Sequence, residues 1–87
     1  MKKLVKYGAS WCGPCRRQDK EFEDNPPKYD LEIVDVDTLE DDELESLNIK
    51  NVPTIILYDI DEEGNKTVIE KWYGFTKTEE INKYPVD

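Results

Sequence analysis

The sequence predicts an α/β fold in which a four-stranded mixed sheet is flanked by helices, in the order β-α-β-α-β-β-α. Three observations predict it. Apolar runs alternate with charged, helix-like stretches in the first half, which indicates a βαβ unit with two parallel strands. Two later apolar runs are separated by a turn containing Gly64-Asn65, which indicates an antiparallel hairpin. Thr76 and Glu79 then have the spacing of a capping box that begins a last helix.

In the first half, the boundaries follow from local patterns. Residues 3–8 form an apolar strand, which we expect near the centre of the sheet. Residues 13–24 form a helix that ends before Asn25-Pro26-Pro27, because prolines cannot continue a helix. Residues 31–36 alternate between polar and apolar side chains and form the second strand, parallel to the first.

In the second half, the signals are shorter. Thr38 is expected to cap a short helix over residues 41–47. Apolar or alternating runs over residues 54–58 and 67–73 form the two strands of the hairpin. The last helix is expected to continue to about Tyr84.

The most informative motif is Trp11-Cys12-Gly13-Pro14-Cys15, which contains the chain's two cysteines. It follows a strand and begins a helix, and a Cys-x-x-Cys pair in that context indicates a redox-active dithiol. At the helix N-terminus, free N–H groups and the helix dipole favour the thiolate of Cys12, the expected nucleophile. Cys15 lies nearly one turn further and is expected to resolve a mixed disulfide. Pro14 fits the first turn, and Gly13 leaves the sulfur accessible.

Two other interpretations of the cysteine pair are weaker. A structural zinc site needs four ligands, whereas the chain has two cysteines and no histidine, so no metal site is expected within one chain. A zinc ion shared across a dimer stays open as an alternative. A purely structural disulfide would close a very short loop, where the gain in loop-closure entropy is smallest.

The motif matches the active site of the thioredoxin family residue for residue, and two further segments match it. Val52-Pro53-Thr54 resembles the segment in which thioredoxins hold a cis proline beside the dithiol, and Gly74 resembles a glycine of the substrate groove. The resemblance implies a minimal thioredoxin fold, with Cys12 as nucleophile and Cys15 as resolving cysteine. It also implies a set of substrate-binding residues: Trp11, Gly13, Pro14, Val52, Pro53, Thr54 and Gly74.

The chain departs from typical thioredoxins in two respects. It reaches Cys12 without the extra strand and helix that precede the motif in that family, so its frame has the size of a glutaredoxin. The double glycine of the glutaredoxin glutathione site is nevertheless absent around Gly74. Lys6 occupies the position of the usual buried aspartate, and Ile33 that of its partner lysine. We expect the Lys6 side chain to extend to solvent rather than to act on the thiols.

Length, charge and hydropathy indicate which kinds of partner and which cellular location to expect. The chain of 87 residues is expected to form a single domain, residues 1–87, and to be monomeric. Its net charge is −9, with +5 in residues 1–20 and −14 in residues 21–87, which argues against a nucleic-acid partner. Apolar runs are too short for a membrane span or for a signal peptide, so a cytoplasmic location and no membrane partner are expected.

The leading functional hypothesis is a thiol–disulfide oxidoreductase that reduces disulfides of protein substrates through a Cys12–Cys15 cycle. The resemblance implies recharging by a thioredoxin reductase or a similar dithiol donor, with no cofactor besides the redox-active disulfide. One alternative is a glutaredoxin-like protein recharged by glutathione. A second alternative is a non-catalytic subunit that binds a partner through the groove around Trp11, Pro53 and Gly74.

Overall fold

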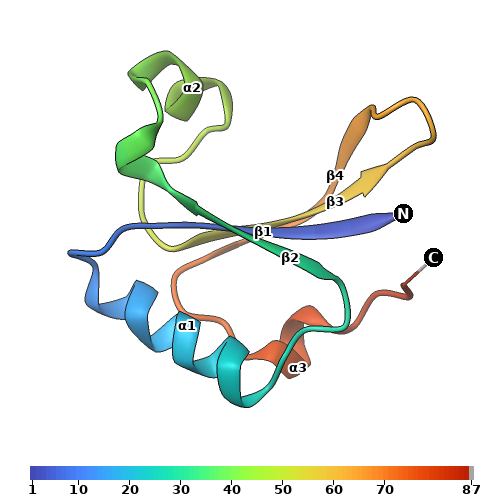
Figure 1. Ribbon diagram of the computed structural model, residues 1–87, viewed down its shortest axis with the longest axis horizontal. Coiled ribbons are helices and arrows are strands. Elements are labelled where there is room, and N and C mark those ends of the chain that lie inside the picture. The colour runs from blue at the N-terminus through green and yellow to red at the C-terminus, as the bar shows by residue number, and fades with distance from the viewer. Residues whose placement is uncertain (87) are drawn as a thin grey trace.

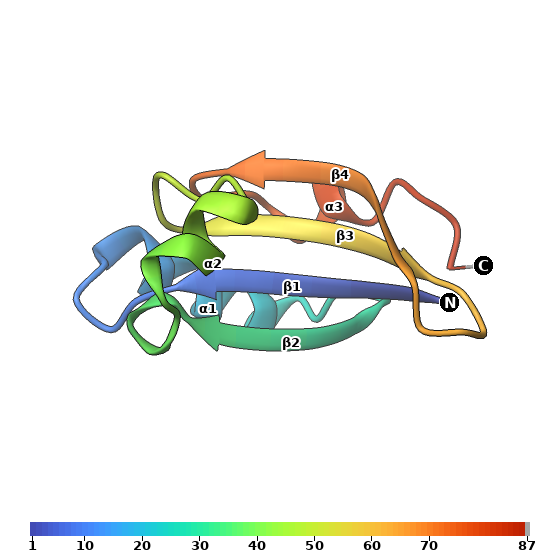
Figure 2. The ribbon, with the colours of Figure 1, turned by 90° about the horizontal axis from the view of Figure 1, so that it is seen from above.

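The computed structural model describes residues 1–86 and contains one four-stranded mixed sheet. The strand order is β2-β1-β3-β4, which Figure 2 shows from above. β1 pairs in parallel with β2 and antiparallel with β3, and β3 forms an antiparallel hairpin with β4. The predicted topology is therefore confirmed, with β1 in the interior of the sheet. The strands span Lys2–Gly8 (β1), Asp30–Asp35 (β2), Thr54–Ile60 (β3) and Lys66–Tyr73 (β4).

The helices cover both faces of the sheet. α1 (Gly13–Asp24) and α3 (Thr78–Ile81) lie on one face, and α2 (Asp41–Ser46) lies on the other (Figure 1). A short 3₁₀ turn, η1 (Val36–Thr38), connects β2 to α2. Within residues 1–86, no helix has both the length and the apolar character needed to cross a bilayer.

The core is divided by the sheet, because successive side chains of a strand point to opposite faces. Beneath α1 and α3, the buried cluster consists of Leu4, Phe22, Tyr29, Ile55, Leu57 and Ile81. On the α2 side it consists of Val5, Tyr7, Ala9, Cys12, Cys15, Val36, Ile56 and Tyr58. Both cysteines thus belong to the second cluster, at the end of the sheet where β1 leads into α1.

The prediction that Thr38 caps α2 is wrong. The Thr38 hydroxyl donates to the carbonyl oxygen of Asp35 at 2.6 Å, which holds η1 instead. The N-cap is Glu40, whose N–H donates to the carboxylate of Glu43 at 3.1 Å. Thr38 is the last residue of η1, whose own N-cap is Asp35, so the 3₁₀ turn takes the Thr38 hydroxyl and α2 begins further along the chain.

The last helix is shorter than predicted, and Thr76 does not cap it. α3 begins after Lys77, and the Thr78 N–H donates to the side chain of Glu21 on α1 at 2.9 Å. The Tyr84 N–H donates to the hydroxyl of Tyr29 at 3.1 Å, and that hydroxyl donates to the Tyr84 carbonyl oxygen at 2.8 Å. Distant side chains therefore take the backbone groups that a longer helix would have satisfied.

Candidate functional site

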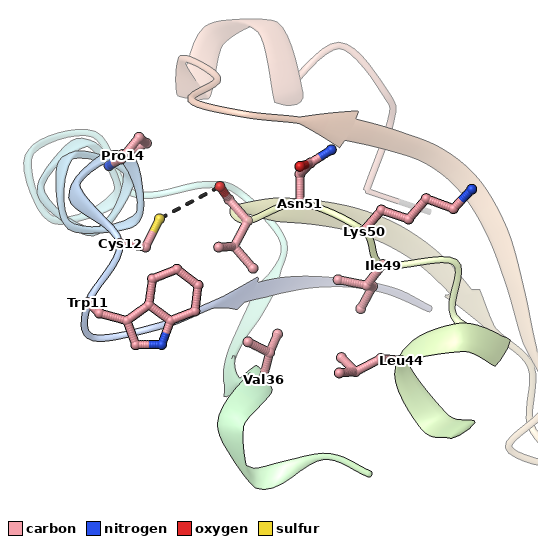
Figure 3. Close-up of a pocket in the computed structure, with 9 residues that line it drawn as sticks. Trp11, Cys12, Pro14, Val36, Leu44, Ile49, Lys50 and Asn51 are labelled. Atoms are coloured by element: carbon pink, nitrogen blue, oxygen red, sulfur yellow. Dashed lines mark hydrogen bonds between the residues drawn. The ribbon is translucent and has the colours of Figure 1, made fainter. Parts of the chain in front are cut away.

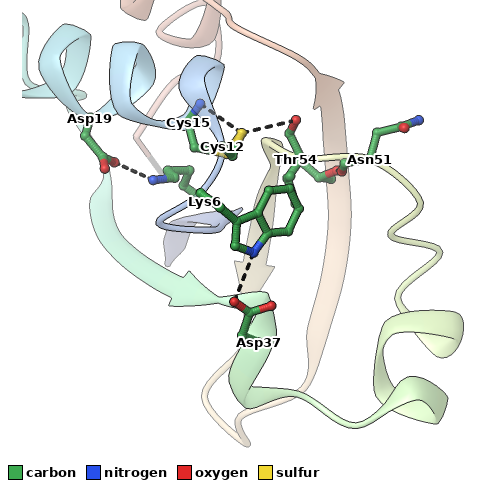
Figure 4. The surroundings of a disulfide bond; sticks show 9 residues. Lys6, Cys12, Cys15, Asp19, Asp37, Asn51 and Thr54 are labelled. Carbon is green, nitrogen blue, oxygen red and sulfur yellow. Dashed lines mark hydrogen bonds and ion pairs between the residues drawn. A yellow bond between two sulfur atoms is a disulfide. The ribbon is translucent and has the colours of Figure 1, made fainter.

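The two cysteines lie at the first turn of α1 and form a disulfide, with their Cα atoms 5.2 Å apart (Figure 4). Cys12 is the N-cap residue, and its sulfur accepts a hydrogen bond from the Cys15 N–H at 3.1 Å. Pro14 lies in the first turn, where the lack of an N–H leaves no helical bond unmade. A free N–H group aimed at the Cys12 sulfur stabilises negative charge there, as a nucleophilic thiolate requires.

The sulfurs are not equally placed. Cys12 is 5% exposed and lines a surface groove, whereas Cys15 is 1% exposed and does not line it. A disulfide of another molecule can therefore approach Cys12, while Cys15 is positioned to act afterwards from inside. This asymmetry matches the nucleophilic and resolving roles that the motif suggests.

The segment before β3 lies directly opposite the dithiol. The Val52–Pro53 peptide bond is cis, as the resemblance implies. The Val52 carbonyl oxygen is 3.6 Å from the Cys12 sulfur, and so accepts a hydrogen bond when that sulfur is a thiol. The Gly74 N–H donates to the Pro53 carbonyl oxygen at 2.8 Å, and Gly74 has a φ of +79°, which favours glycine. Cys12, Val52, Pro53 and Gly74 are thus brought together.

Thr54 lies outside the groove lining. It is fully buried, and its hydroxyl donates to the carbonyl oxygen of Asn51 at 2.7 Å. This bond holds the loop that carries Val52 and Pro53. Gly13, by contrast, faces the solvent side of α1, and a Cβ atom added there would meet no atom within 4 Å.

A groove of about 470 Å³ extends from the dithiol toward α2 (Figure 3). Its walls are largely apolar, apart from two polar residues of the loop before Val52. The lining comes from Trp11, Cys12, Pro14, Val36, Leu44, Ile49, Lys50, Asn51 and Val52. The residues nearest the dithiol were predicted from the sequence, whereas the place of Val36, Leu44, Ile49, Lys50 and Asn51 in this site was not.

Asp37 is a further site residue that the sequence analysis missed. Trp11 is 67% exposed, yet its indole Nε1–H donates to the Asp37 carboxylate at 3.0 Å. The Asp37 N–H in turn donates to the side chain of Asp35 at 2.9 Å. The run Asp35-Val36-Asp37-Thr38 carries the signature of a side-chain-stabilised turn, but its contact with a tryptophan 26 residues away is visible only in the structure.

We expect Asp37→Ala to release the Trp11 indole with little loss of stability, about 0.5–1.5 kcal/mol, because a typical hydrogen bond contributes that much. The rate of reaction with protein disulfides is expected to fall several-fold, since the groove wall loses its fixed position. Tryptophan fluorescence and chemical denaturation measure the two effects. Asp30→Ala, at the far end of β2, is the matched control and is expected to change neither.

The expectation that Lys6 extends to solvent is wrong. Its side chain is 3% exposed and forms an ion pair with Asp19 of α1 (Figure 4). The strand pattern predicted a solvated lysine because polar residues in strands usually point outward. Here α1 covers that face of β1, and the carboxylate that makes burial possible comes from the helix.

Within residues 1–86, acidic, histidine and cysteine side chains do not gather in any group of three or more that could hold a metal ion.

On the α2 side of β1, the hydroxyls of Tyr7 and Tyr58 lie 3.2 Å apart. Burial and the hydrogen bond with the Tyr58 hydroxyl raise the pKa of Tyr7, so the Tyr7 phenol stays protonated.

A comparison with protein-family models matches residues 1–84 to the thioredoxin family. The chain belongs to the thioredoxin family. A curated relative, the thioredoxin of Borreliella burgdorferi, is 26% identical, and the match covers 83% of this chain and 74% of the relative. A crystal structure of a Plasmodium falciparum thioredoxin superposes with a TM-score of 0.72 and 26% identity, covering 94% of this chain.

A structure of thioredoxin-2 of the malaria parasite, described as a component of protein secretion machinery, also gives a TM-score of 0.72 at 26% identity. The chain spans 66% of the Plasmodium falciparum thioredoxin and 78% of the thioredoxin-2 chain. The thioredoxin fold and family are therefore established for this chain, together with a cysteine pair able to form a disulfide.

Proposed function

We propose that this thioredoxin-family protein reduces disulfides of other proteins through a Cys12–Cys15 dithiol–disulfide cycle. The observation that carries the proposal is the arrangement of the two sulfurs. Cys12 lies at the end of an apolar groove and accepts an N–H hydrogen bond, and Cys15 lies buried behind it, bonded to it. A structural disulfide would need neither the groove nor a helix N-terminus at its outer sulfur.

The proposed cycle has two exchanges. The Cys12 thiolate attacks one sulfur of the target disulfide, a mixed disulfide forms, and the other target sulfur leaves as a thiolate that takes a proton from water. The Cys15 thiolate then attacks the Cys12 sulfur. The Cys12–Cys15 bond forms, the bond to the target breaks, and the second target sulfur leaves with the electron pair. The target disulfide is reduced by two electrons and the dithiol is oxidised.

Recognition is proposed to use backbone and apolar contacts. The backbone of Val52 adjoins the Cys12 sulfur at the start of β3, where an extended segment of a target can pair in the manner of an added strand. Leu44 and Ile49 offer an apolar wall for side chains on either side of the target cysteine. Such contacts favour unfolded or mobile disulfide-bearing segments and select little by sequence.

We propose recharging by a flavoprotein thioredoxin reductase or a similar dithiol donor, in a reducing compartment such as the cytoplasm. Glutathione is the alternative reductant, and the chain lacks the double glycine of glutathione sites near Gly74. A monomer suffices for the cycle, because both sulfurs and the groove belong to one chain.

Two reductant systems test this assignment. With insulin as the target, we expect NADPH and a thioredoxin reductase to sustain turnover at least about tenfold faster than glutathione and glutathione reductase. A faster glutathione-coupled rate would instead support the glutaredoxin-like alternative. If neither system sustains turnover and a Cys12→Ser/Cys15→Ser variant still performs the normal cellular role, the results would support a non-catalytic binding subunit.

A further inference from the structure

A buried ammonium group lies behind the dithiol. It lies close to the Cys15 sulfur over Gly8 of β1: a Cβ atom added to Gly8 would lie 3.1 Å from the Lys6 Nζ and 3.2 Å from the Cys15 Sγ. The two groups therefore border the same point and lie within about 6 Å of each other. At that distance, in a site shielded from solvent, a charge alters the ionisation of its neighbour strongly.

The surroundings of Lys6 do not cancel its charge. Asp19 pairs with it from α1 but is half exposed, so water screens the carboxylate more than the ammonium. Arg16 of α1 and Asp35 of β2 line the same small recess. On the remaining strand, β3, the residue in register with Lys6 is the apolar Ile55. Of these charged groups, the Lys6 ammonium is the one that lies, together with the Cys15 sulfur, next to the position that a Gly8 Cβ atom would occupy.

Burial of this lysine has no evident structural benefit. An isolated buried charge is costly, and a buried ion pair is often no more stable than apolar side chains of the same size. A methionine would fill the space over Gly8 with no charge to compensate. The position of Lys6 therefore indicates an electrostatic role. Because an ammonium group cannot accept a proton, this role is to stabilise a nearby negative charge and not to act as a base.

We propose that Lys6, held by Asp19, is a positioning residue that stabilises the thiolate of the resolving Cys15. The inference rests on the proposed function, since it describes one step of the same cycle. The proton of Cys15 is released to water, not to Lys6, and the ammonium then faces the thiolate that attacks the Cys12 sulfur. The same charge stabilises Cys15 as the leaving thiolate when a dithiol donor attacks Cys12 during recharging.

The test follows the Cys15 ionisation directly, in a Cys12→Ser background that leaves one thiol. Thiolate absorbance or the cysteine Cβ chemical shift is recorded against pH. We expect Lys6→Met to lower the thiolate-to-thiol ratio at a given pH about tenfold. Asp19→Asn is expected to raise that ratio about threefold, because the amide oxygen still accepts a hydrogen bond from the ammonium while the opposing negative charge is lost.

The opposite signs distinguish charge from structure, since two variants that merely loosen packing would shift the ratio in the same direction. Lys3→Met and Asp30→Asn are the matched controls. Lys3 lies on the same strand in an ion pair with Glu32, and Asp30 lies at the start of β2. Each control makes the same change in net charge as its counterpart, and we expect both to leave the ratio unchanged.

A second readout is the equilibrium of the Cys12–Cys15 pair with glutathione. Lys6→Met is expected to shift it toward the disulfide and Asp19→Asn toward the dithiol. Equal ratios in all variants, or shifts of the same sign, would overturn the role of Lys6. Because Asp19 is half exposed, its variant is expected to fold even where Lys6→Met does not. Neither readout requires a protein substrate, so a failure of the proposed function would leave this result interpretable.

Discussion

Replacing Cys12 by serine is expected to reduce disulfide-reductase activity to the uncatalysed background. The serine hydroxyl stays protonated at neutral pH and cannot form the mixed disulfide, so the first exchange of the cycle is lost. Fold stability is expected to change little beyond the loss of the disulfide itself, because serine is nearly the size of cysteine and Cys12 lines the surface groove. Insulin reduction with a thioredoxin reductase measures the effect.

Cys15→Ser is the informative counterpart of Cys12→Ser. It leaves the nucleophile intact but removes the buried sulfur that resolves the mixed disulfide. We expect it to accumulate a covalent complex with the target that is stable in non-reducing electrophoresis and released by dithiothreitol. Equal trapping by the two variants, or trapping by Cys12→Ser and not by Cys15→Ser, would contradict the assigned order of attack.

The largest expected effect on stability comes from Gln18 of α1. This side chain is fully buried, and its amide pairs with both backbone groups of Thr76, donating to the carbonyl oxygen at 2.8 Å and accepting from the N–H at 2.7 Å. Gln18→Met retains the volume but leaves two backbone groups without partners. The free energy of unfolding is expected to fall by about 2–4 kcal/mol.

The Gln18 substitution also tests how the groove is built. Thr76 follows Gly74, whose N–H binds the Pro53 carbonyl oxygen, so the amide of Gln18 supports the segment opposite the dithiol. Denaturant unfolding measures stability, and insulin reduction well below the melting temperature measures function. Arg17→Met, at the exposed neighbouring position, is the control. A loss no greater than that of the control would show that the Thr76 backbone finds other partners.

The sequence could predict the elements whose limits are set locally. α1 has the predicted bounds because Pro14 fits its first turn and two prolines follow Asn25 at its end. The hairpin was predicted from a short polar turn with Gly64, which has a φ of +87°. These signals act within a few residues, so they are legible without the fold.

The features that the sequence could not predict depend on contacts between distant segments. α3 ends early because Tyr29, from the connection before β2, takes the backbone groups of Tyr84. Lys6 is buried because α1 brings Asp19 over β1. Periodicity and capping rules describe neighbours along the chain, whereas these residues are separated by 55 and 13 positions.

Within the site too, the residues with a local sequence signal were predicted and those that depend on long-range contacts were not. The cysteine motif and Val52-Pro53 were found from residue types and order, because their chemistry is distinctive. Asp37 and Ile49 are ordinary residues that become part of the site through η1 and the loop after α2. Their contribution follows from where the groove runs, which composition and spacing do not specify.

The first experiment should measure electron transfer from the reduced protein to a target disulfide in a single turnover. The protein is fully reduced, freed of reductant, and mixed with a slight excess of a protein that contains one accessible disulfide. We predict that each chain opens about one disulfide and that the Cys12–Cys15 bond forms at the same rate. A target disulfide that stays closed while the dithiol remains reduced would contradict the proposed function.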